Sequence, residues 1–271
     1  MRVAVVGHLE WVEFVRVERV PVIGDIVHGM PLLSVPAGGG AVAAVQLARW
    51  GAQSIFFTAL GDDDLGHRAR DDLRARGVEV YTTFRSEPQR RAVTLIDPQR
   101  DRTIIVIGER LVAHGSDPLP WAELESCDAV YITGGDVEAI RQARRARVVV
   151  ATSRILPLLR EANIQLDALV GSANDRSEAY TRGDLPLVPR LSVRTDGGRG
   201  GSFELAGGEP QPYAPVPTVV TGDTYGAGDT FAAALTFALG EGRTAADAVA
   251  FAAARSAEVV TFIGPYPPGS P

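Results

Sequence analysis

Residues 221–240 read TGDTYGAGDTFAAALTFALG, and this stretch decides the fold. Three glycines and two aspartates fall within eight positions, and an alanine-rich apolar run follows at once. A glycine-rich turn that enters a helix presents free backbone N–H groups at the positive end of the helix dipole. Gly226, Ala227 and Gly228 carry too little side chain to keep an anion away. Asp229 follows in the first helical turn, where a carboxylate could act as a base or simply cap the helix.

The rest of the chain alternates short β-rich runs with helical stretches rich in Ala and Arg. Strands that alternate with helices predict crossover units and a parallel sheet, the α/β class, which binds ligands beyond the carboxyl ends of its strands. The predicted strands are 3–6, 54–60, 129–133, 146–152, 167–172 and 190–195, and the predicted helices are 41–50, 65–76, 231–239 and 245–262.

Two segments, about 10–35 and 79–107, have alternating strand patterns without helices. The turn DPQRD at 97–101 marks a hairpin in the second of them. We expect the two segments to form a small β-sheet lid on a single domain that spans residues 1–271. Such a lid would cover a site or pair with another subunit, although a peripheral decoration remains an alternative.

Composition excludes several classes of function. The chain has 271 residues, 45% of them hydrophobic, and a net charge of −6, which gives no electrostatic case for binding nucleic acid or an anionic membrane. No segment approaches the roughly 18 uncharged apolar residues of a membrane span. A single cysteine, Cys127, permits neither an internal disulfide nor a zinc cluster, so we expect a cytoplasmic protein.

The motif Asp223–Asp229 fits the DTxGAGD signature of the ribokinase-like (PfkB) carbohydrate kinases. Further segments resemble that family in the expected order and cover nearly the whole chain. They are 5–27 (first strand and lid), 37–52 (GG element), 59–78 (G.D..G), 195–200 (TxGxxG) and 251–264 (last helix). The resemblance implies a three-layer α/β/α ribokinase-like fold, with a mostly parallel central sheet and a small β lid.

The resemblance also implies an activity: transfer of the γ-phosphoryl group of ATP to a hydroxyl, commonly a hydroxymethyl group, of a small molecule. It makes Asp229 the catalytic base and the Gly226–Gly228 turn the anion hole, with Mg²⁺ neutralising the phosphates. Four positions would contact the nucleotide: Thr195, Gly197, Gly200 and Thr224.

The acceptor side departs from the family pattern. Val12 and Val42 stand where the family often has an Asp and an Asn that hold sugar hydroxyls. A buried site without these partners should not hold an ordinary furanose in the usual way. The remaining candidates for substrate contact are Glu10, Gly38, Gly39 and Arg91.

The family's NxxE motif, which orders Mg²⁺ and its waters, is also altered. Asn174 lies four residues before Glu178 rather than three. Asp175 stands at the correct spacing, so we expect Asp175 and Glu178 to serve the metal, with a solvated loop as the alternative. A monovalent cation near the loop of Gly264, found in some relatives, remains open.

Several functions stay open at this point. A sugar or modified sugar is the leading acceptor. The alternatives are a nucleoside kinase, a phosphosugar kinase that uses Arg90 or Arg91 for the substrate phosphate, and a non-catalytic relative that only binds ligands. The intact signature argues against the last, because a pure binder does not need Asp229. Exposed strand edges in the lid make a homodimer plausible.

Overall fold

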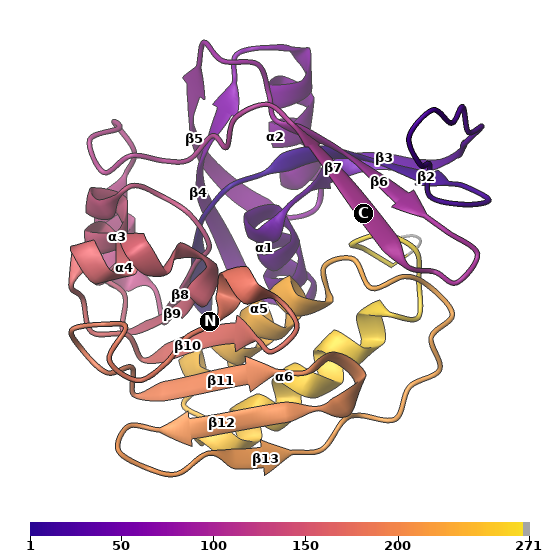
Figure 1. Ribbon diagram of the computed structural model, residues 1–271. Coiled ribbons are helices and arrows are strands. Elements are labelled where there is room, and N and C mark those ends of the chain that lie inside the picture. Colours follow the sequence, from indigo (N-terminus) through magenta and orange to yellow (C-terminus); the bar gives the residue numbers. More distant parts are fainter. Residues whose placement is uncertain (268–271) are drawn as a thin grey trace.

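The computed structural model describes residues 1–267. Its centre is a nine-stranded sheet with the order β13-β12-β11-β10-β9-β8-β1-β4-β5 (Figure 1). Neighbouring strands are parallel from β5 to β11, whereas β12 and β13 are antiparallel at one edge. The strands are β1 (Arg2–Val6), β4 (Gln53–Gly61), β5 (Val78–Arg85), β8 (Ala129–Ile132), β9 (Val148–Thr152), β10 (Ala168–Ser172), β11 (Leu191–Thr195), β12 (Gly201–Leu205) and β13 (Gln211–Tyr213).

Helices cover both faces of this sheet and make three layers. Alternate residues of a strand point to opposite faces, so Val3 and Val5 pack with one set of helices while Ala4 and Val6 pack with the other. The first set is α1 (Gly39–Arg49), α2 (Asp64–Ala75), α5 (Ala227–Gly240) and α6 (Ala245–Val259); the second is α3 (Val137–Ala143), α4 (Leu156–Ala162) and the 3₁₀ turn η1 (Trp121–Ser126). No helix within residues 1–267 is long and apolar enough to cross a membrane.

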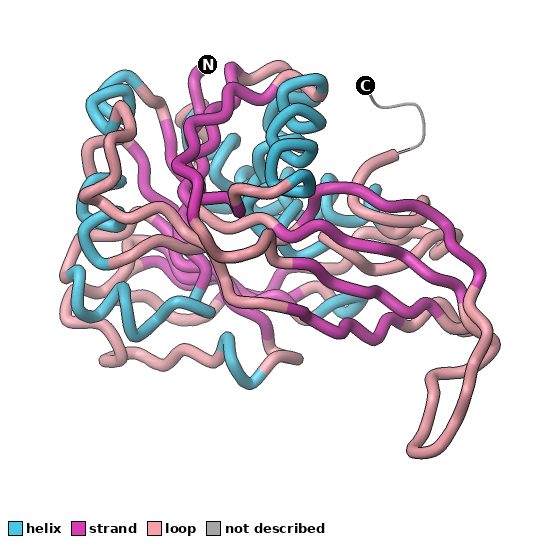
Figure 2. The backbone as a smooth tube through the Cα atoms, turned by 90° about the horizontal axis from the view of Figure 1, so that it is seen from above, coloured by secondary structure: helices cyan, strands magenta, loops and turns pink. Residues whose placement is uncertain are grey.

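A second sheet of four strands, the lid, projects from one side of this body (Figure 2). Its order is β3-β2-β6-β7, with β2 (Glu10–Arg16), β3 (Met30–Ala37), β6 (Arg91–Ile96) and β7 (Arg102–Ile107). The expected hairpin is present, and Arg100 adopts a left-handed conformation (φ 68°) in its turn.

The predicted lid boundary at residue 79 was wrong. Residues 78–85 form β5, which pairs in parallel with β4 over eight residues at the edge of the main sheet. The lid portion of the second segment is therefore confined to β6 and β7 and the turn between them.

Candidate active site

The turn Gly226–Gly228, called the signature turn below, begins α5. Asp223 holds this turn in place. Asp223 is fully buried, and its two carboxylate oxygens accept hydrogen bonds from the backbone N–H groups of Tyr225 and Gly264, each at 2.7 Å. Gly226 is left-handed (φ 75°), which brings the chain into the helix without a side-chain cap. The turn is thus fixed by buried hydrogen bonds while the end of the helix stays unblocked.

The N-terminus of α5 can accept an anion. First-turn N–H groups have no acceptor within their own helix, and no side chain caps this one. A Cβ added at Gly228 would meet nothing within 4 Å, so the turn is open on that side. Asp229 is the third residue of the helix and makes no capping bond, which removes the capping alternative. The open N-terminus of α5, called the anion cradle below, therefore fits a phosphate group.

Asp229 lies where α5 meets the start of α1. A Cβ added at Gly39 would lie 2.8 Å from Asp229 Oδ1 and 2.7 Å from Thr133 Oγ1, so only glycine leaves room for the carboxylate. Burial raises the pKa of Asp229 to about 6, with the nearby charge of Glu178 adding to the effect. The positive charges of Arg154 and Arg102 act in the opposite direction. A carboxylate with this pKa is ionised at neutral pH but remains a competent base.

The two proposed metal carboxylates share one arginine. Arg154 Nη2 contacts Asp175 Oδ2 at 2.7 Å and also pairs with Glu178. Burial raises the pKa of Glu178, whereas a hydrogen bond from Ser177 lowers that of Asp175. Among residues 1–267, no group of three or more His, Cys, Asp or Glu side chains gathers to hold a metal. Two carboxylates still suit Mg²⁺ that takes its other ligands from phosphates and water, provided that Arg154 gives up part of its pairing.

The TxGxxG loop is shaped by its glycines. Thr195 ends β11 and its hydroxyl donates to the carbonyl of Gly171 at 3.3 Å. Gly197 and Gly200 both have positive φ, 55° and 87°. A Cβ at Gly200 would lie 2.3 Å from the carbonyl oxygen of Tyr213, so this glycine is required by crowding. Asn174 Oδ1 accepts a hydrogen bond from Arg199, which ties the loop to the neighbouring acidic segment.

The lid reaches the signature turn through two arginines. Arg102 of β7 donates to the carbonyl oxygen of Thr224 at 3.0 Å and to its hydroxyl. Arg100, in the hairpin turn, donates to the carbonyl oxygen of Val220 at 3.0 Å. The lid therefore lies over the same loop that forms the anion cradle, in the position expected for a cover that excludes water.

Of the adjacent Arg90 and Arg91, the structure brings Arg90 to the site. Arg90 Nε lies 2.7 Å from Glu10 Oε1, and both side chains are largely buried. Arg91, which we expected at the substrate, is exposed on lid strand β6. Successive strand residues face opposite sides, which explains why only one of the pair turns inward. Gly38, also expected there, donates its N–H to the Tyr225 hydroxyl at 3.2 Å.

The two valines that we expected at the sugar-contacting positions are part of an apolar cluster. Val12 and Val42 are both fully buried and pack with Phe14 and Tyr225. The rings of Phe14 and Tyr225 meet edge to face at 4.9 Å. Apolar side chains therefore surround both valines.

Sequence reasoning missed Arg154 and Arg102. Arg154 lies two residues after the end of β9, and a charged side chain near the carboxyl end of a parallel strand is a signal that could have identified it. Arg102 sits in an alternating lid strand, where nothing in the pattern marks its contact with Thr224.

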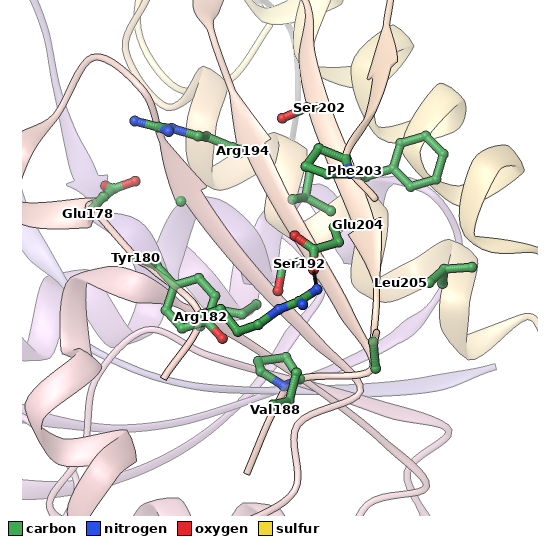
Figure 3. A pocket seen from close by; sticks show the side chains of 16 residues that line it. Glu178, Tyr180, Arg182, Val188, Ser192, Arg194, Ser202, Phe203, Glu204 and Leu205 are labelled. Carbon is green, nitrogen blue, oxygen red and sulfur yellow. Dashed lines mark hydrogen bonds and ion pairs between the residues drawn. The ribbon is translucent and has the colours of Figure 1, made fainter. Parts of the chain in front are cut away.

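A hollow of about 170 Å³ lies beside the site (Figure 3). It is lined by β10, β11 and β12 and by the segment after η3 (Arg176–Glu178), with Arg182, Ser192 and Glu204 at its centre. Glu178 is at its edge, but Asp229 does not line it. It is therefore not the place where an acceptor would meet the base.

The parallel sheet, the β lid and the glycine cradle beside a half-buried carboxylate define a small-molecule kinase with the ribokinase fold. Arabidopsis thaliana ribokinase, solved with ribose and ATP, superimposes with a TM-score of 0.76 at 22% identity, covering 97% of this chain and 93% of its own. A probable sugar kinase from Rhizobium etli gives a TM-score of 0.80 at 18% identity, covering 99% and 96%.

Sequence comparison gives the family. The model described as "pfkB family carbohydrate kinase" matches residues 1–169 and 165–271. Bacillus subtilis ribokinase is 27% identical over 96% of this chain and 93% of its own length. Fructoselysine 6-kinase of Shigella flexneri is 30% identical over 85% of this chain and 92% of its own length. The chain belongs to the pfkB family of carbohydrate kinases, which use ATP.

Proposed function

We propose that this kinase phosphorylates a hydroxymethyl group of a sugar or sugar-like molecule. The observation that carries the proposal is Asp229, a half-buried carboxylate with a pKa of about 6 beside the uncapped N-terminus of α5. A base and an anion cradle on one helical turn are the two elements that phosphoryl transfer to a hydroxyl requires.

The proposed reaction proceeds by direct transfer. The acceptor oxygen attacks the γ-phosphorus of ATP, the bond to the bridging oxygen breaks, and ADP leaves with its electron pair. Asp229 takes the hydroxyl proton, while backbone N–H groups of the Gly226–Gly228 turn stabilise the charge on the moving phosphoryl group. Asp175 and Glu178 would hold Mg²⁺, which neutralises phosphate charge, and the TxGxxG loop would hold the nucleotide.

The acceptor differs from an ordinary furanose in this proposal. Val12 and Val42 offer no hydrogen bonds, so binding energy must come from other side chains or from apolar parts of the substrate. Relatives named ribokinase and fructoselysine 6-kinase indicate that the family accepts varied sugars. A non-catalytic role fits less well, because a carboxylate whose pKa is raised by folding costs stability that a binder would not need.

We also propose that two copies pair through their lids, in the cytoplasm. Strand β7 is an edge strand, and its residues Ile104, Ile105, Val106 and Ile107 are between 40% and 50% exposed. Unpaired edges with apolar side chains favour pairing with another strand. Ile105→Lys should convert a dimer to a monomer in light scattering, whereas Leu187→Lys, outside the lid, should not.

The function is tested by ADP release from Mg-ATP with a panel of pentoses, hexoses, their phosphates and nucleosides. We expect release with one class of acceptor, and its loss in Asp229→Asn. Equal release by the variant would remove Asp229 from the mechanism. A monovalent cation is tested in the same assay by exchanging sodium for potassium.

A further inference from the structure

The guanidinium group of Arg154 lies between the two carboxylates that we propose for the metal. Its Nη2 contacts Asp175 Oδ2 at 2.7 Å and pairs with Glu178, and its Nη1 donates to the Ser177 hydroxyl at 3.1 Å. A single nitrogen thus bridges two carboxylates at the 3₁₀ turn η3. A divalent cation held by the same two carboxylates would need the same place. Arg154 therefore supplies one positive charge where the metal would supply two.

Both oxygens of Asp175 are already engaged. Oδ1 accepts hydrogen bonds from the backbone N–H of Ser177 at 2.9 Å and from its hydroxyl at 2.7 Å, while Oδ2 accepts from Arg154. Mg²⁺ binds a carboxylate oxygen at about 2.1 Å. A guanidinium nitrogen on the same oxygen would lie close to the ion, and the two positive charges would repel each other. A metal therefore reaches Asp175 Oδ2 only after Arg154 has left it.

The backbone around the two carboxylates is held without the Arg154 side chain. The hydroxyl of Ser153, a buried residue, donates to the carbonyl oxygen of Glu178 at 2.6 Å. A Cβ added at Gly171 would lie 2.5 Å from Ser153 Oγ and 2.7 Å from that carbonyl oxygen, so glycine leaves room for this hydrogen bond. The Arg154 side chain itself is 40% exposed, and exposed ion pairs are weak. The guanidinium group can therefore move away while the turn keeps its shape.

We propose that Arg154 competes with the metal for Asp175 and Glu178 in the nucleotide-free protein and releases them when ATP binds. The inference rests on the proposed kinase function and names the residue that controls its metal site. Arg199 ties Asn174, next to Asp175, to the TxGxxG loop at 3.2 Å, so the carboxylates adjoin the loop proposed for the nucleotide. A phosphate group there gives the released guanidinium a new charged partner. Nucleotide and metal then each raise the affinity for the other.

The test is calorimetric titration of the nucleotide-free protein with Mn²⁺, which takes the same oxygen ligands as Mg²⁺. Arg154→Gln should bind Mn²⁺ roughly 10-fold more tightly than the wild type, because the competing cation is gone. Arg176→Gln is the matched control: Arg176 lies in the same turn, is exposed, and forms no ion pair within residues 1–267. It removes the same charge without opening the carboxylates, so the Mn²⁺ affinity should change far less. Arg154→Met replaces Arg154→Gln if the latter does not fold.

Two further titrations locate the ion and measure the coupling. Adding Glu178→Gln to Arg154→Gln should abolish the gain in Mn²⁺ affinity, and a gain that persists overturns the proposal. A non-hydrolysable ATP analogue should raise the Mn²⁺ affinity of the wild type by a larger factor than that of Arg154→Gln.

Equal Mn²⁺ affinities of Arg154→Gln and Arg176→Gln, equal factors with the analogue, or no binding by Arg154→Gln overturn the competition even if the enzyme is active. Absence of Asp229-dependent ADP release with every acceptor contradicts the kinase proposal, while the Mn²⁺ titrations still decide the role of Arg154.

Discussion

Replacing Asp229 with asparagine should make the protein more stable and at the same time nearly inactive. The carboxylate is half-buried where α5 meets Gly39, and folding raises its pKa from the ordinary 3.8 to about 6. A carboxyl group whose pKa is raised by folding destabilises the folded state whenever it is ionised. The cost is fully present above about pH 6 and vanishes below about pH 4. Asparagine keeps the shape of the side chain and removes the charge.

The size of the effect follows from the same values. A rise of about two pKa units, at about 1.4 kcal/mol each, corresponds to about 3 kcal/mol. The charge also interacts favourably with the N-terminus of α5, which subtracts about 0.3–1 kcal/mol from the gain. Burial outweighs the helix dipole, so we expect Asp229→Asn to gain about 2 kcal/mol at pH 7.5. Turnover should fall by a factor of about 10²–10⁴, the usual contribution of a positioned base.

The assay is urea unfolding of ligand-free wild type and variant at pH 7.5 and pH 4.5, followed by ADP release at pH 7.5. The stability difference should shrink at the lower pH, because the wild-type carboxyl is then protonated when folded. Asp71→Asn is the control: this exposed carboxylate pairs with Arg70, which lowers its pKa, so its removal should give no gain. An equal gain for Asp229→Asn at both pH values, or a loss at pH 7.5, would refute the reasoning.

Four further outcomes are expected. The wild-type kcat should rise with pH through about 6 as Asp229 ionises; a flat profile from pH 5 to 8 would exclude it as the base. Arg154→Gln removes a charge that lowers the pKa of Asp229, so the midpoint of that profile should move to higher pH. An unmoved midpoint would contradict an electrostatic effect of Arg154 on Asp229. Val42→Asn places an amide in an apolar cluster and should cost about 2–4 kcal/mol in urea unfolding, with Val42→Ile as control; a neutral result would mean that the cluster is open to a ligand. Arg102→Ala should raise the KM for ATP while changing the free energy of unfolding by less than about 1 kcal/mol, because it removes only exposed contacts to Thr224. An unchanged KM would show that this lid contact does not affect nucleotide binding.

The parts of the fold that were predicted correctly are those with strong local patterns. The buried runs of the central sheet and the alanine-rich α5 lie close to their expected bounds. Helices α3 and α4 were missed because seven residues span only two turns, too few for a clear helical period. Strand β5 was assigned to the lid because its pattern, VEVYTTFR, alternates like a lid strand. Strand β5 belongs to the main sheet because it pairs with β4. A local sequence pattern does not show which distant segment a strand pairs with.

The site shows the same division between local and long-range information. The turn at Gly226 and the place of Asp229 in the first turn of α5 were predicted because a turn and a helix start depend on adjacent residues. The choice of Arg90 over Arg91 depended on the face that β6 turns inward, and thus on one-residue register. The contact of Arg154 with Glu178 joins the turns that follow β9 and β10, so the sequence showed the carboxylate but not its partner.

The two halves of the candidate site are built in different ways, which explains why the sequence predicts one to follow the family pattern and the other to depart from it. The phosphate side consists mainly of backbone: a left-handed glycine, an uncapped helix and the buried Asp223 that holds them. Almost any substitution in this turn would change the backbone conformation that presents the N–H groups. Every kinase that transfers the γ-phosphoryl group of ATP must bind that same group. The acceptor side consists of side chains on β2 and α1, among them Val12 and Val42, which can change while the backbone stays in place. The two valines therefore support our proposal of a different acceptor, and the backbone geometry of the turn supports our proposal of retained catalysis.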